Sequence, residues 1–100
     1  MLTTGKSSLI LFMPMDIVIL DSAYKHGISK RSILFCLLHF HSDIVIEDHP
    51  SKRLFVGFDH MGSALEIIVI EDNEKDRLVV IHAMKLRKQF YHLLIEEGII

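Results

Sequence analysis

The sequence predicts a small α+β domain, in which an antiparallel β-sheet of three or four strands follows N-terminal helices and precedes a C-terminal helix. Residues 53–58, 63–71 and 77–82 are rich in β-branched and aromatic residues, and only short polar segments separate them. Apolar residues at helical spacing occur before these segments, in residues 30–40, and after them, in residues 86–97.

The helices have recognisable start and stop signals. Asp21 or Ser22 can cap a first helical turn, which Gly27 would end as a C-terminal glycine. Ser29 offers a second N-cap, and we expect the helix after it to lie on the sheet. Gly98 would end the closing helix. The apolar positions of the second helix are Ile33, Leu34, Leu37 and Leu38, and those of the closing helix are Leu86, Phe90, Leu93 and Leu94.

The remaining segments complete a single domain over residues 15–100. Residues 16–20 predict either a short strand or the lead-in to a helix, and residues 43–48 predict a further strand. We expect residues 1–14 to be an N-terminal extension that is disordered or lies upstream of the natural start. Its apolar run, residues 9–13, is too short to span a membrane.

Composition narrows the class of protein. The formal net charge of −2 means that nucleic-acid binding would need a local basic patch. Seven histidines make protonation a variable near neutral pH. Cys36 is the single cysteine, so no intramolecular disulfide can form, and this suits a reducing cytoplasm. We expect a cytoplasmic protein with no membrane partner.

The turns predict a strand register. Residues 59–62 form a tight turn and residues 72–76 a polar loop, so Phe55 lies opposite Glu66, and Glu66 lies opposite His82. One face is then wholly apolar and lies beneath the helices: Leu54, Val56, Phe58, Leu65, Ile67, Val69, Val79 and Ile81. The other face is partly open and holds Arg53, Phe55, Gly57, Glu66, Ile68, Val80 and His82.

The partly open face has the groups for RNA cleavage without a metal ion, which needs a base, an acid and a cation. Glu66 and His82 would be base and acid, in either order, and Arg53 would stabilise the phosphate. The alternative is an ordinary cross-strand pair beside an edge-strand cation.

Candidates for RNA binding surround this set. Cations and aromatic rings could hold the phosphates and stack the bases: Lys85, Arg87, Lys88, Tyr91 and Phe55. The alternative for the cations is a solvated helix face. His26 and His60 are further candidates for the site. The alternative for both is a structural role in a turn.

Three other histidines do not indicate a metal site. His39, His41 and His49 lack a convincing ligand spacing. We therefore expect no metal and no cofactor.

Several segments resemble the BrnT-type toxins of bacterial toxin–antitoxin pairs. Lys25-His26-Gly27-Ile28-Ser29 resembles their opening KHG(I/V)S segment, and residues 48–57 resemble one of their strands. Residues 65–84, with Arg87 and Tyr91, resemble their last hairpin and basic helix. The resemblance covers roughly residues 16–95. At His82 the chain resembles a divergent branch that carries histidine where many relatives have a serine–arginine pair.

The resemblance implies the fold of RelE-like ribonuclease toxins and metal-independent RNA cleavage. It also implies a cognate antitoxin as the partner, with mRNA, free or on the ribosome, as the substrate. Two other functions stay open: a catalytically inactive module that anchors an antitoxin or represses a promoter, and a small-molecule or structural domain that forms a dimer. A homodimer or a heterotetramer with the antitoxin is open as well.

Overall fold

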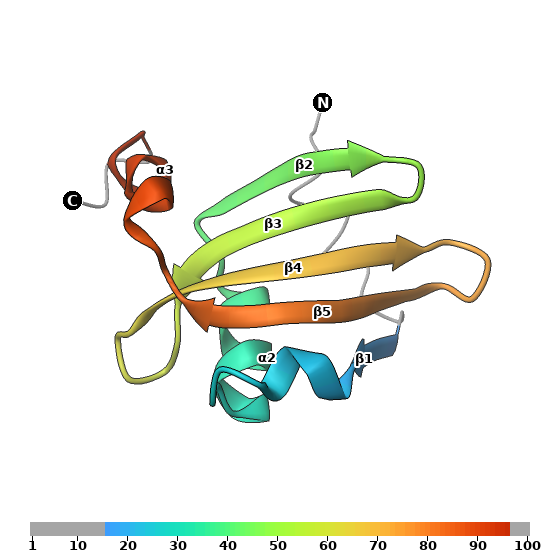
Figure 1. Cartoon of the computed structure of the whole chain (residues 1–100), viewed down its shortest axis with the longest axis horizontal. Coiled ribbons are helices and arrows are strands. Elements are labelled where there is room, and N and C mark those ends of the chain that lie inside the picture. Colours follow the sequence, from blue (N-terminus) through green and yellow to red (C-terminus); the bar gives the residue numbers. More distant parts are fainter. Residues whose placement is uncertain (1–15, 97–100) are drawn as a thin grey trace.

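The computed structural model describes residues 16–96, with side chains for residues 16–95, and shows a five-stranded mixed sheet in an α+β domain (Figure 1). The strands are β1 (Asp16–Ile19), β2 (Ser42–Asp48), β3 (Ser51–Phe58), β4 (Ala64–Asp72) and β5 (Arg77–Lys85). The 3-10 helices are η1 (Asp21–Tyr24) and η2 (Lys88–Phe90), and the α-helices are α2 (Lys30–Leu38) and α3 (Tyr91–Glu96). The predicted class is confirmed. The predicted extension at residues 1–14 and the expected helix end at Gly98 lie outside the described residues.

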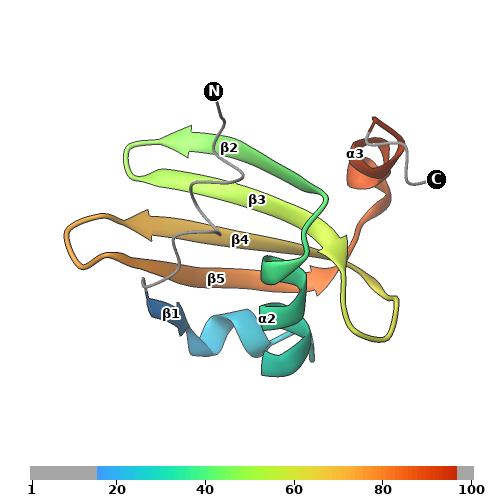
Figure 2. The same cartoon turned by 180° about the vertical axis from the view of Figure 1, so that it is seen from behind.

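The sheet contains a parallel pair that was not predicted. Its strand order is β1-β5-β4-β3-β2, and β1 pairs parallel with β5 from Asp16 opposite Arg77 to Ile19 opposite Val80. The N–H of Leu20 extends the pairing by donating to the carbonyl of Val80 at 3.0 Å. Residues 16–20 therefore take the strand alternative. The other four strands form the expected antiparallel meander (Figure 2).

The first helical segments follow the predicted signals except at the start of η1. Its N-cap is Leu20, and no side chain caps it, so the predicted cap at Asp21 or Ser22 was wrong. Gly27, at φ +79°, ends the turn that begins in η1. The side chain of Ser29 caps α2 by accepting a hydrogen bond from the N–H of Ser32 at 3.1 Å. The helix ends at Leu38, two residues before the predicted end.

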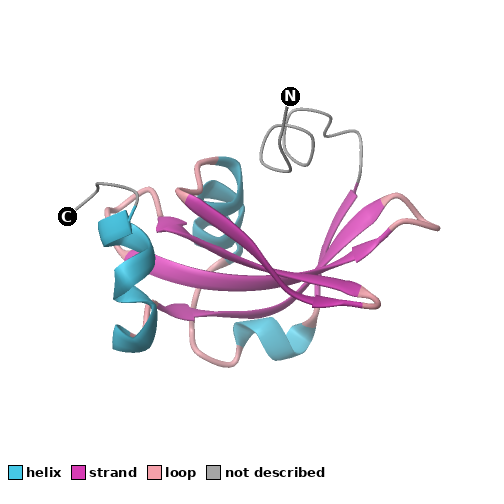
Figure 3. Ribbon diagram, turned by 90° about the horizontal axis from the view of Figure 1, so that it is seen from above, coloured by secondary structure: helices cyan, strands magenta, loops and turns pink. Residues whose placement is uncertain are grey.

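Two cores lie on opposite faces of the sheet. Figure 3 shows helices on both sides of the strands. On one face, α2 and η1 cover the larger core. Its members are Ala23, Ile33, Cys36, Leu37, Phe55, Leu65, Ile67, Val69, Leu78, Val80 and Ala83. On the other face, Leu86, Leu93 and Leu94 from the C-terminal segment pack against Leu54 and Val56 of β3. The helices thus lie on both faces, whereas the sequence predicted them on one.

The β3–β4 register differs by one residue from the prediction. Phe58 pairs with Ala64, because the loop contains five residues, 59–63, instead of four. The Asp59 carboxylate builds this loop by accepting the N–H groups of Met61 and Ser63, each at 2.9 Å. Phe55 consequently lies opposite Ile67, beneath α2, and Glu66 lies opposite Val56. The predicted division of residues between the two faces was wrong for β3. It was also wrong for Val79 and Val80 of β5, because Val80 pairs with Val69 and lies in the core under α2.

The β4–β5 register differs twice. Asp72 pairs with Arg77, which shortens the loop by one residue, and a bulge then shifts the register between Ile68 and Val69. His82 therefore lies opposite Ile68, two residues from its predicted partner Glu66. Because side chains alternate with a period of two, this double shift leaves Glu66 and His82 on one face.

The closing helix is shorter than predicted, since α3 begins at Tyr91 and not at Leu86. The N–H of Leu86 donates to the carbonyl of Ala64, and Arg87 keeps an extended backbone with φ −82° and ψ 152°. These bonds hold the chain to the sheet until η2 begins. Lys85 consequently ends a strand and does not start a basic helix.

Candidate functional site

Glu66 is the centre of a cluster on the sheet face opposite α2. It lies in β4 and is 0% exposed. Its Oε1 accepts the backbone N–H of Arg87 at 3.0 Å, and its Oε2 accepts Nη2 of Arg87 at 2.6 Å. Burial alone would raise the pKa of Glu66, but the hydrogen bonds from Arg87 and His82 outweigh it and hold this pKa below its ordinary value. The carboxylate is therefore ionised near neutral pH.

His82 is held by the same carboxylate. Its Nε2 lies 3.0 Å from Oε2 of Glu66, and its side chain is 21% exposed. An ionised carboxylate only accepts hydrogen bonds, so Nε2 of His82 must carry the proton in this contact. A neutral His82 ring then presents Nδ1 as a proton acceptor.

Arg87 closes the cluster from the extended segment between β5 and η2. Its Nε and Nη2 both donate to Glu66, and its side chain is 44% exposed. The hydrogen bonds to Glu66 raise the pKa of Arg87, so its charge is permanent. The guanidinium also lies 5.4 Å from the ring centroid of Phe90.

A second imidazole stands beside His82. The ring of His26 is 5.6 Å from that of His82, centroid to centroid, at an interplanar angle of 71°. His26 is exposed and follows η1, which packs along β5, so the turn that Gly27 ends brings it to the cluster. We call His26, Glu66, His82 and Arg87 the imidazole cluster.

The sequence predicted part of this cluster. The proximity of Glu66 and His82 is confirmed, although the register behind the prediction was wrong. Arg87 was expected to face RNA, and the structure places it first against Glu66. The KHG segment signalled His26, whereas nothing local in the sequence signalled its contact with His82.

Arg53 does not belong to the cluster. Its Nε and Nη2 donate to Asp43 at 2.7 and 3.0 Å, and its Nη1 donates to Glu71 at 3.3 Å. It pairs with Val69 of β4, whose side chain lies in the core under α2, so it points to the face opposite Glu66. The predicted grouping of Arg53 with Glu66 and His82 was wrong. Two carboxylates around one guanidinium also leave this spot net negative, which disfavours phosphate binding.

Phe55 cannot stack an RNA base in this structure, because it is fully buried. Its ring packs against Phe40 at 4.9 Å between centroids, in the core under α2. The one-residue error in the β3–β4 register explains this correction.

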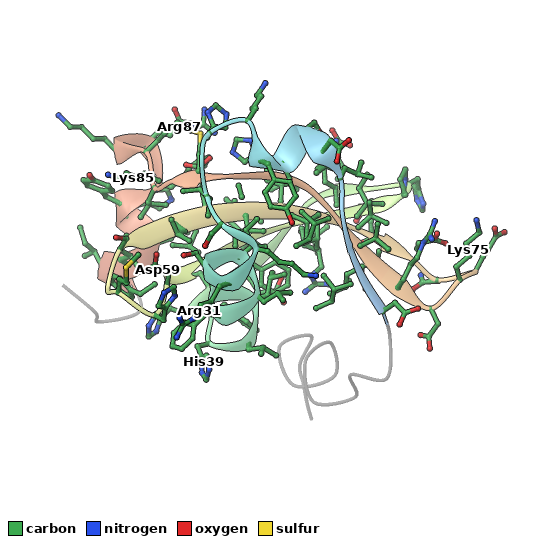
Figure 4. The ribbon with its side chains drawn as sticks, turned by 90° about the horizontal axis from the view of Figure 1, so that it is seen from below. Arg31, His39, Asp59, Lys75, Lys85 and Arg87 are labelled. Atoms are coloured by element: carbon green, nitrogen blue, oxygen red, sulfur yellow. The ribbon has the colours of Figure 1, made fainter. Side chains whose placement is uncertain are left out.

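Other RNA-binding candidates surround the end of β5. Lys85 and Lys88 are exposed, and Tyr91 is 44% exposed. Lys85 and Arg87 lie at one end of the molecule, whereas Lys75 lies at the other (Figure 4). A cavity of about 400 Å³ opens beside them, lined by Phe58, Ser63, Ala64, Lys85, Leu86, Tyr91 and Leu94. His60 instead faces Phe35 of α2, with ring centroids 6.1 Å apart.

The described part of the chain, residues 16–96, has neither a candidate metal site nor a helix that could span a membrane. No group of three or more His, Cys, Asp or Glu side chains within residues 16–95 could hold a metal ion. No helix among them is long and apolar enough to cross a membrane.

Comparison of the chain with protein-family models, with curated proteins and with solved structures gives no match. The geometry of the imidazole cluster is therefore the basis for assigning a function.

Proposed function

We propose that the chain is a metal-independent endoribonuclease that acts at the imidazole cluster, and that it is the toxin of a type II toxin–antitoxin pair with a RelE-like fold. The observation that carries the proposal is the pair of imidazoles, 5.6 Å apart, one of which is held by a buried, ionised carboxylate. The resemblance to BrnT-type toxins supplies the biological setting: a cytoplasmic protein, RNA as substrate and a cognate antitoxin.

The cleavage step needs only two proton transfers and one displacement. Nδ1 of His82 removes the proton of a ribose 2′-OH, and the oxygen attacks the adjacent phosphorus. The bond from phosphorus to the 5′-oxygen breaks, and a protonated His26 gives its proton to that oxygen. The products are a 2′,3′-cyclic phosphate and a free 5′-hydroxyl, so atoms and charge balance without a metal or a cofactor.

Electrostatics favour this division of roles. Glu66 and Arg87 cancel one another, so a protonated His26 gives the cluster a net positive charge. The half-exposed edge of Arg87 can donate further hydrogen bonds, since a guanidinium has five N–H groups. Both cations would stabilise the charge that develops on the phosphorane.

Glu66 takes a different role from the one predicted. Its oxygens are buried and bonded, and its pKa is lowered, so it is poorly placed to move a proton to a substrate. It is a positioning residue that fixes the ring orientation of His82, as an acceptor on the far nitrogen does in other acid–base sites.

A second candidate function is the catalytically inactive binding module. It is favoured by the edge strand β2, where the consecutive residues Ile44, Val45 and Ile46 are all exposed. Such a strand suits pairing with an extended segment of an antitoxin. This candidate predicts capture of the antitoxin without RNA cleavage.

A growth and cleavage experiment separates the two candidates. Expression of the wild-type chain without its antitoxin should arrest growth, and His82→Ala should abolish the arrest. With RNA, free or on ribosomes, His82→Ala and His26→Ala should each lower cleavage by at least about 100-fold. The matched control is His39→Ala, which removes an exposed histidine at the end of α2 (Figure 4).

The products check the mechanism. Cleavage should continue in a chelator, stop at a 2′-deoxy nucleotide and leave a 2′,3′-cyclic phosphate. A folded His82→Ala variant that cleaves as fast as the wild type would refute the catalytic role. Wild-type protein that binds an antitoxin but leaves RNA intact would support the binding module.

A further inference from the structure

We propose that the cavity beside the C-terminal segment is a nucleobase pocket, which holds the base next to the scissile phosphate. This inference rests on the proposed ribonuclease function and names how the substrate is recognised. The cavity of about 400 Å³ lies within the range of small-ligand pockets. The sequence named Lys85 and Tyr91 of its lining as RNA-binding candidates, but it did not predict the cavity.

The lining suits a planar aromatic ligand that carries negative charge. Phe58, Leu86 and Leu94 form apolar walls, and Tyr91 adds a second aromatic ring that remains 44% exposed. Bases stack on such rings whatever their sequence, because each base has a π-face. Among the side chains of residues 16–95, no carboxylate lines the cavity, so no described lining group repels a nucleotide.

A cation lies between this cavity and a second hollow on the α2 side of the sheet, because Lys85 lines both. Lys85 is exposed, and its ammonium group pairs with no acidic side chain of residues 16–95. An unpaired lysine beside an aromatic wall matches the two ends of a nucleotide, a phosphate and a base. An apolar side chain of a protein partner would use the walls but not this charge.

The cavity is a neighbour of the imidazole cluster. Leu86 lines the cavity, and the next residue, Arg87, binds Glu66 through its backbone and side chain. Ala64 and Glu66 lie two residues apart on β4 and so point to the same face. Figure 4 shows Lys85 and Arg87 at the same end of the molecule. A strand whose phosphate meets Arg87 can therefore place the adjoining base in the cavity.

Binding of an uncleavable RNA tests the pocket separately from catalysis. The probe is a fluorescent single strand of about eight nucleotides, uniformly 2′-O-methylated so that the attacking hydroxyl is blocked. Tyr91→Ala should weaken binding by about tenfold, whereas Tyr91→Phe keeps the ring and should stay within about twofold of wild type. Lys85→Ala should weaken binding and lower its salt dependence, and the matched control Lys75→Ala should do neither.

Abasic substitution locates the base. When each base of the probe is removed in turn, one position should lose about tenfold in affinity for wild type and almost nothing for Tyr91→Ala. Equal losses at all positions, or no binding by wild type, would overturn the pocket. So would unchanged binding by folded Tyr91→Ala and Lys85→Ala variants. If the pocket is overturned but the protein still cleaves RNA, the proposed ribonuclease function is retained. If one base position is bound specifically but no RNA is cleaved, the ribonuclease function is refuted and the pocket is retained.

Discussion

The Glu66 carboxylate is fully buried and ionised, and its hydrogen bonds offset the cost of removing its charge from water. His82 and Arg87 both donate to it, and Arg87 does so from its backbone and its side chain. The carboxylate therefore joins β5 to the segment before η2 and aligns the imidazole. Stability and the proposed activity at this site depend on the same atoms.

Replacement of Glu66 by glutamine should separate these effects. Glu66→Gln keeps the shape but removes the charge, and it replaces one acceptor oxygen with a donor that faces Arg87 and His82. We expect the free energy of unfolding to fall by about 1–3 kcal/mol, measured by urea denaturation. We also expect cleavage to fall by about tenfold or more at saturating RNA, because His82 loses its orientation.

The control for this variant is Glu74→Gln, at an exposed position in the loop between β4 and β5. It removes the same charge and should change stability by less than about 0.5 kcal/mol. Equal stability of wild type and Glu66→Gln would show that the buried hydrogen bonds contribute nothing net, and it would contradict the positioning role.

Among the secondary-structure elements, the turns predicted from the sequence separate the correct strands, but the registers inferred from their lengths were wrong. A residue count cannot tell whether residue 63 ends the turn or begins the strand. The Asp59 carboxylate decides this, because it accepts the N–H of Ser63 and also the hydroxyl of Ser32, far away in α2. The register of β3 therefore depends on a tertiary contact that local patterns do not contain.

The prediction that Glu66 and His82 share a face was correct because two one-residue register errors add up to a shift of two residues, which restores the original face. The loop between β4 and β5 is one residue shorter than predicted, and the bulge adds a second shift before His82 is reached. One shift alone would have placed the imidazole under α2. The β3–β4 register contains only one such error, so the prediction placed Arg53 and Phe55 on the wrong face.

The packing of β3 against α2 makes a prediction about Gly57. A Cβ at this position would lie 3.0 Å from Cα of Phe40 and 3.3 Å from Sγ of Cys36. Because the closer neighbour is a backbone atom, it cannot move without displacing the chain after α2. Gly57→Ala should therefore lower the free energy of unfolding by about 1–3 kcal/mol in urea denaturation.

Gly62 provides the contrast, because its φ is +84° and a Cβ there would meet nothing within 4 Å. Gly62→Ala should cost about 1 kcal/mol through backbone strain, and Gly62→Asn should cost less, since asparagine tolerates this conformation. At Gly57 asparagine should be worse than alanine. The opposite order at Gly57 would contradict the steric explanation.

For the whole molecule, composition and pattern predicted the class and the meander but not the complete sheet. The partners β1 and β5 lie at opposite ends of the described chain, and their parallel pairing leaves no signal in either segment. The position of α3 was missed for a related reason. Backbone bonds of Leu86 and Arg87 to β4 keep the chain extended where helical periodicity alone favours a helix.

The pH dependence of stability follows from three buried groups. Burial raises the pKa of Glu66 and of Asp59, but the hydrogen bonds that each carboxylate accepts outweigh this effect. The pKa of Glu66 is therefore lowered from its ordinary value of 4.5, and that of Asp59 from 3.8. Below these values the unfolded chain takes up more protons than the folded one, so stability falls with falling pH. Burial, aided by the charge of Asp59, raises the pKa of Cys36 from 9.0 to about 12. Above 9.0 the unfolded thiol loses its proton first, so stability falls with rising pH.

Urea denaturation across this pH range should therefore show a plateau bounded by an acid and an alkaline decline. Variants assign each decline to its group. Glu66→Gln has no carboxyl to titrate and should lose less stability than wild type on acidification, whereas Cys36→Ala should lose less on the alkaline side. Glu74→Gln, which removes an exposed carboxylate, should follow the wild-type curve. If Glu66→Gln loses as much stability in acid as wild type does, the ion pair with Arg87 is not what holds the end of β5 in place. The alignment of His82 would then need another cause.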